Sequence, residues 1–197
     1  RYPSGPAGGL TLEPNPFEFA AKHLVHIEAE RPVNLPGTPV ACFAYSNKDG
    51  KLKVRELSVY EETGLFEGER FLGFYWDRQK PSTWFNGYTY IDTLDPNAVR
   101  SFIEHGLEPY KKHFAKEFGG RIPGVFTDEP QMFSERTGPD TSTWPWTVRF
   151  PIEFRRRRGY DLLGHLASLV LTTENYRQVR YDFWRTAIEL FLEAWCE

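Results

Sequence analysis

The chain has 197 residues, of which 40% are hydrophobic and 16% aromatic, and its net charge is −3. This length suffices for a folded domain with a sizeable core, and the charge balance gives no sign of a nucleic-acid surface. The one basic run, Arg155–Arg158, precedes a glycine and is typical of an exposed helix end. The longest weakly polar stretch, residues 162–171, is too short to span a bilayer. We therefore expect neither nucleic acid nor a membrane as a partner.

The two cysteines, Cys42 and Cys196, form neither a disulfide framework nor a zinc signature, which leaves the redox compartment open. The chain opens on Arg1 and not on Met, so we expect the true N-terminus to lie upstream, and export stays open. No repeat or low-complexity linker interrupts the sequence. We therefore predict a single domain over residues 1–197.

The first half of the chain predicts one helix, a hairpin and a core strand. The helix is expected from Pro16 to about Glu30, with Asn15 as its N-cap and apolar residues at helical spacing. A β-hairpin insertion follows over about residues 40–60, with a turn in which Gly50 can take positive φ. Residues 71–76 read FLGFYW and predict a core strand.

The second half predicts a strong amphipathic helix, a buried strand and two further helices. Asp95 and Pro96 are typical of a helix start, and apolar residues then recur at helical spacing until Gly119 and Gly120. Residues 122–126 form a short apolar run that we interpret as a buried strand ending before Pro130. Helices are expected near residues 160–171 and from about residue 173, the second with an apolar face that includes Val179, Phe183, Ala187 and Leu190.

Strands and helices that alternate along a chain favour an α/β fold with parallel strands. About three strands of the barrel type are recognisable, where a complete (β/α)8 barrel has eight and spans roughly 250 residues. We therefore predict the N-terminal half of a (β/α)8 TIM-type barrel, with the hairpin at about residues 40–60 as an excursion. The chain would be a fragment of a larger protein.

Two adjacent acids, Asp128 and Glu129, follow the predicted strand at residues 122–126. Catalytic residues of a (β/α)8 barrel lie at that end of a strand. Because neighbouring strand residues point to opposite sides, we assign Glu129 as candidate general acid and Asp128 as a candidate orienting or hydroxyl-binding group. In the alternative interpretation both acids cap the next segment or pair with arginines.

The segment from residue 76 to residue 92 combines aromatic rings with polar groups, as a sugar site requires. The C–H faces of a sugar stack on flat rings, and its hydroxyls need fixed polar partners. The candidate substrate-binding residues of this segment are Trp76, Trp84, Asn86, Tyr90 and Asp92. Core packing is the alternative role for the rings. Asp92 is also one candidate for the second carboxylate of a glycosidase, although we favour a residue beyond the end of this chain.

Metal chemistry has little support in the sequence. His23 and His26 are three residues apart, whereas a helical zinc pair is four apart with an adjacent glutamate. His105 and His113 are eight apart. Calcium held by carboxylate oxygens cannot be identified from sequence, so the metal ligands stay unknown.

Six segments carry a family resemblance through their order and spacing: RYPSGPAGG, GFYW, WFNGYTYIDTLDPNAV, IPGVFTDEP, RGYDLLGHL and VRYDFWRTAIELF. Together they resemble a large bacterial group of glycosyl hydrolases similar to the α-L-rhamnosidases of glycoside hydrolase family 106. The resemblance implies a catalytic (β/α)8 barrel, an inverting mechanism and a calcium ion that aids substrate binding. It places Glu129 at the acid position after the fourth strand. Asp128 stands where many barrel glycosidases carry Asn, which puts a retaining mechanism in doubt.

We therefore predict a glycoside hydrolase acting on O-glycosidic bonds, α-L-rhamnosides included, with Glu129 as general acid. The isolated chain is expected to be inactive, because its second carboxylate would lie outside it. One alternative is a non-catalytic carbohydrate-binding domain. Another is a structural fragment that self-associates through open sheet edges. The sugar, the linkage and the stereochemical course stay open.

Overall fold

The computed structural model describes residues 9–59, 64–126, 130, 132 and 143–196. The chain divides into two compact units. Unit 1 comprises Arg1–Lys22, Arg78–Phe133 and Glu189–Glu197, and unit 2 comprises His23–Asp77 and Ser134–Ile188. The single domain over residues 1–197 stays a prediction, because compact units do not by themselves define domains.

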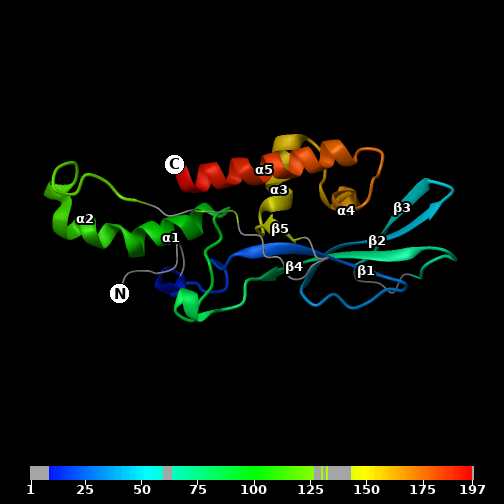
Figure 1. The fold of residues 1–197 in the computed structure, drawn as a ribbon, viewed down its shortest axis with the longest axis horizontal. Coiled ribbons are helices and arrows are strands. Elements are labelled where there is room, and N and C mark those ends of the chain that lie inside the picture. Colours follow the sequence, from blue (N-terminus) through cyan, green and yellow to red (C-terminus); the bar gives the residue numbers. More distant parts are fainter. Residues whose placement is uncertain (1–8, 60–63, 127–129, 131, 133–142, 197) are drawn as a thin grey trace. The chain divides into compact units, whose positions relative to one another are not determined.

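Unit 2 is built on a five-stranded sheet with the strand order β3-β2-β4-β1-β5 (Figure 1). The strands are β1 (Lys22–Ala29), β2 (Thr38–Lys48), β3 (Lys51–Leu57), β4 (Arg70–Arg78) and β5 (Thr143–Trp146). β2 pairs antiparallel with β3 on one side and with β4 on the other.

This sheet shows that the predicted α/β half of a (β/α)8 TIM-type barrel is wrong. Such a barrel needs parallel strands joined by helical crossovers, whereas a two-residue turn can join only antiparallel strands. The hairpin is present, but it is part of the central sheet and not an excursion from a barrel. The chain is α+β, with a sheet that contains antiparallel strands and with several helices.

The hairpin turn consists of Asp49 and Gly50, whose φ angles are 53° and 75°. Two-residue hairpin turns of this kind need positive φ at both positions, which glycine adopts without steric cost. The turn fixes the register by pairing Lys48 with Lys51, and further along it pairs Phe43 with Glu56.

Alternation along β2 divides the sheet into two faces. On one face Cys42, Ala44, Leu57 and Phe71 form a buried apolar cluster. On the other face Phe43 contacts Phe74 edge-to-face, with ring centroids 6.1 Å apart.

Three helices of unit 2 lie on one side of the sheet in Figure 1. They are α3 (Phe150–Arg158), α4 (Ala167–Val170) and the part of α5 (Tyr176–Cys196) that ends at Ile188. The short helix η4 (Leu163–His165) precedes α4. Phe150 on α3 packs against Phe183 on α5, with ring centroids 4.7 Å apart. α5 buries the face that its apolar spacing predicts.

Unit 1 contains α1 (Pro96–Gly106), α2 (Glu108–Phe114) and the short helices η1 (Gly9–Leu12), η2 (Thr83–Phe85) and η3 (Ala115–Glu117). Its core is formed by Leu12, Ala21, Phe85, Tyr90, Ile91 and Ala98. The Asp95 side chain accepts a hydrogen bond from the backbone N–H of Asn97 at 2.9 Å, which confirms the predicted helix start.

Four predicted elements differ in the structure. The helix expected near residues 160–171 is divided into the two short helices η4 and α4. The predicted helix from Pro16 is wrong, because residues 22–29 form β1 and alternate between the two faces of a sheet. The long helix after Asp95 is interrupted at Leu107, because Pro109 has no N–H to donate and its ring disfavours a continuous helix. The run at residues 122–126 forms no strand, and Phe126 is 86% exposed.

We expect Gly50→Ala to lower the free energy of unfolding by about 1–2 kcal/mol, because an L-residue is strained at positive φ. Gly64→Ala is the control, since nothing lies within 4 Å of the added methyl group, and it should change stability by less than about 0.5 kcal/mol. Urea unfolding of both variants measures the difference. Equal effects would contradict the role of Gly50 in the turn.

Candidate functional site

The predicted catalytic pair lies outside the described residues, and the predicted sugar-binding residues are distributed over both units. Asp128 and Glu129 are not described. Trp76 is half-buried on β4 in unit 2. In unit 1, Trp84 is 72% exposed on η2 and Tyr90 is 2% exposed, with its ring against Phe85.

Asn86 ends η2 in a left-handed conformation with φ 56°, and its backbone N–H donates to Thr83 O. Its side chain is exposed, as is that of Trp84, whereas Tyr90 and Asp92 are buried. The segment that follows β4 thus directs two of its candidate residues into the unit 1 core and two into solvent. A substrate-binding role for these residues stays a prediction.

Asp92 forms a buried ion pair with Lys22, in which both side chains are 2% exposed and Nζ lies 3.1 Å from Oδ2. An ammonium group has three donors, and the Lys22 Nζ uses the other two on the carbonyls of Glu18 and Ala20. The other oxygen of Asp92 accepts from the backbone N–H of Leu94 at 3.1 Å. These contacts give Asp92 a structural function in unit 1 that sequence analysis did not predict.

We expect Lys22→Met and Asp92→Asn each to lower the free energy of unfolding by about 3–5 kcal/mol, because each leaves the other buried group without its ionic partner. The double variant should lose less free energy of unfolding than the two single variants lose together, by at least about 1 kcal/mol. A double-mutant cycle from urea unfolding measures this coupling. Strict additivity would show that the pair contributes no coupling energy.

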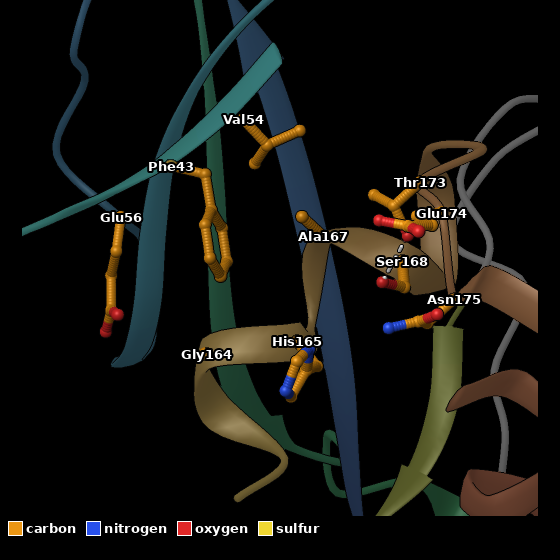
Figure 2. Close-up of a pocket in the computed structure, with 10 residues that line it drawn as sticks. All are labelled: Phe43, Val54, Glu56, Gly164, His165, Ala167, Ser168, Thr173, Glu174 and Asn175. Atoms are coloured by element: carbon orange, nitrogen blue, oxygen red, sulfur yellow. Dashed lines mark hydrogen bonds between the residues drawn. The ribbon is translucent and has the colours of Figure 1, made fainter. Parts of the chain in front are cut away.

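Unit 2 contains a pocket of about 200 Å³ between the β2–β3 hairpin and the segment from residue 164 to residue 175 (Figure 2). One wall is apolar and the rim is polar. The lining residues are Phe43, Val54, Glu56, Gly164, His165, Ala167, Ser168, Thr173, Glu174 and Asn175. None of them belongs to the predicted site.

The hairpin register places three of these side chains on one face of the sheet. Phe43 is the cross-strand partner of Glu56, and Tyr45 is the partner of Val54. Because side chains two residues apart on a strand share a face, Val54 and Glu56 lie on the same side as Phe43. Phe43 is buried, so it contributes part of the inner wall, whereas Glu56 is exposed at the rim.

The opposite wall is the connection from α4 to α5, which hydrogen bonds hold in place. The Ser168 and Thr173 hydroxyls are 2.7 Å apart and share a hydrogen bond. The Arg180 guanidinium on α5 donates to the carbonyls of Ser168 at 2.9 Å and Val170 at 3.2 Å. Glu174 and Asn175 immediately precede α5 and are exposed.

His165 lies at one end of the pocket with its ring perpendicular to that of Tyr160, the centroids being 5.3 Å apart. The Tyr160 hydroxyl donates to Asp182 Oδ2 at 3.0 Å, and Gln178 donates to the same oxygen at 2.7 Å. Burial and this hydrogen bond to Asp182 raise the pKa of Tyr160 well above its usual range. Tyr160 therefore stays protonated and acts as a fixed donor behind His165.

Three arginines, two of them from the basic run on α3, surround one buried acid. The Glu153 carboxylate contacts Arg149 at 2.9 Å, Arg156 at 2.8 Å and Arg157 at 3.4 Å. Burial raises the pKa of Glu153, but the hydrogen bond from Arg156 and the three positive charges outweigh burial and lower it. The run ends at Gly159 with φ 81°, which confirms its place at a helix end.

Because the folded-state pKa of Glu153 is lowered, its contribution to stability is present above the unfolded-state pKa of about 4.3 and is lost as the pH falls through the folded-state value. We expect Glu153→Gln to lower the free energy of unfolding by about 1–3 kcal/mol at pH 7. The difference from wild type should shrink below about pH 4. Unfolding curves from pH 3 to pH 7 measure it, and a difference that does not change with pH would contradict the assignment.

In the described part of the chain, no group of three or more His, Cys, Asp or Glu side chains is placed to hold a metal ion. No described helix combines the length and the apolar character that crossing a membrane requires. Comparison of the chain with protein-family models, curated proteins and solved structures gives no match. The resemblance to family 106, with its calcium ion, stays a prediction.

Proposed function

We propose that unit 2 binds a carbohydrate in the pocket between the β2–β3 hairpin and residues 164–175. The proposal rests on one observation. The pocket is lined by apolar side chains on one part and by hydroxyl, amide and carboxylate groups at its rim (Figure 2). The C–H surface of a sugar would pack against the apolar part, and its hydroxyl groups would hydrogen-bond to the polar rim. Phe43, Val54 and Ala167 form the apolar part.

The size of the pocket sets the size of the ligand. Pockets for drug-sized ligands measure roughly 300–1,000 Å³, whereas this one measures about 200 Å³. It therefore fits one sugar ring and not an extended chain. A contact of this size supports weak binding, with a Kd on the order of 1 mM.

Hydrolysis of glycosides stays a separate prediction, since Glu129 and Asp128 lie outside the described residues. The pocket supports binding without requiring that chemistry. It therefore favours the carbohydrate-binding alternative.

An NMR titration of the ¹⁵N-labelled chain with single sugars, L-rhamnose included, tests the proposal. We expect chemical-shift changes at the backbone amides of Val54, His165, Ser168 and Thr173. Thr173→Val keeps the shape of the side chain but removes its hydroxyl, and should weaken binding about 3–10-fold.

Trp84→Ala is the matched control, because Trp84 is exposed in unit 1 and belongs to the sequence-predicted site. It should leave the affinity unchanged. Binding that depends on Trp84 and not on Thr173 would move the sugar site to the segment after β4. Absence of any shift at the pocket would contradict the proposal.

A further inference from the structure

We propose that the pocket selects sugars that carry a protonated amino group. This inference rests on the proposed carbohydrate binding and adds the charge of the ligand. The ten lining residues include two carboxylates, Glu56 and Glu174, and neither Lys nor Arg. These two glutamates give the described lining its acidic character.

The two carboxylates reach the pocket from different walls. Glu56 belongs to β3 and Glu174 precedes α5, and Figure 2 shows their side chains on opposite sides of Phe43. No ion pair joins either of them to a residue in the described ranges. An ionised carboxylate is purely an acceptor, whereas an ammonium group is purely a donor with three N–H bonds.

Asp161 adds a third carboxylate close to Glu56. Its Oδ2 accepts from the backbone N–H of Gly164 at 3.1 Å. A methyl group on Gly164 would lie 3.8 Å from Glu56 Oε2 and 3.9 Å from Asp161 Oδ2. These two acids therefore flank the same glycine at the edge of the pocket.

The cations on the neighbouring elements are directed elsewhere. Lys53 and Arg55 alternate with Val54 and Glu56 along β3, so they belong to the opposite face of the sheet. Arg55 pairs there with Glu69 at 2.7 Å. Arg180 donates its N–H groups to the carbonyls of the α4–α5 connection.

An amino group on the sugar therefore meets carboxylates that basic side chains have not neutralised. Ion pairs in a solvent-accessible pocket contribute at most about 1 kcal/mol each, which is about a fivefold gain in affinity per carboxylate. Because the two carboxylates lie on opposite sides of Phe43, one amino group pairs with one of them, and we expect an amino sugar to bind about fivefold more tightly than its neutral parent at low salt. The gain should decline as salt screens the charges. A sugar acid should bind more weakly than either.

Titration of the full chain with D-glucosamine, D-glucose, N-acetyl-D-glucosamine and D-glucuronate tests this order, with backbone amide shifts as the readout. N-acetyl-D-glucosamine keeps a nitrogen substituent at the same carbon without its charge. Glu56→Gln and Glu174→Gln preserve side-chain size, and replacing the carboxylate that pairs with the amino group should abolish the roughly fivefold preference for glucosamine over glucose. Glu67→Gln is the control, because Glu67 is exposed in unit 2 and does not line the pocket.

Equal affinities for glucosamine and glucose, with shifts at the pocket, would overturn the charge preference and leave the proposed function standing. A preference that survives both pocket substitutions would also overturn it. If none of the four sugars shifts the pocket amides, carbohydrate binding itself fails. Cyclohexylamine provides the last comparison: an affinity equal to that of glucosamine would show that the hydroxyls contribute nothing, which contradicts a sugar ligand.

Discussion

The turn at Asp49 and Gly50 is the constraint on which the candidate site depends, because it fixes the register of β2 against β3. A shift of one residue would move every side chain of β3 to the other face of the sheet. Val54 and Glu56 would then leave the pocket, and Leu57 would leave the buried cluster around Cys42. The same two positive φ angles therefore hold both the core of unit 2 and one wall of its pocket.

The elements that sequence analysis predicted correctly are those specified by local signals. The cap at Asp95 is a contact within one turn of chain, and the buried face of α5 follows from helical spacing alone. The hairpin is likewise local, since its turn joins strands adjacent in sequence. In each case the residues that carry the signal are also those that make the contact.

The wrong predictions involve segments whose partners are distant in sequence. Residues 22–29 carry apolar side chains compatible with a helix, and only their place between β4 and β5 makes them a strand. Asp92 shows the same limit for the site. In the sequence, an acid among aromatic residues is typical of a sugar-binding residue. In the structure, its partner is Lys22, which lies seventy residues earlier in the chain and 3.1 Å from Asp92. The sequence did not predict the pocket, because its walls come from residues 43–56 and 164–175, and only the fold brings these two distant segments together.

Glutamate has two different roles in unit 2, and neighbouring charges separate them. Glu153 is buried among three arginines of α3 and its N-cap, so its charge is satisfied locally and it serves stability. Glu56 and Glu174 are exposed at the pocket without such partners among the described residues, so their charge faces solvent and any ligand that enters. A carboxylate that stabilises the fold does so by pairing with cationic side chains of the protein. A carboxylate that binds a cationic ligand must instead have no such pair before the ligand arrives. The basic run on α3 thus offsets a buried acid and leaves the acidic character of the pocket intact.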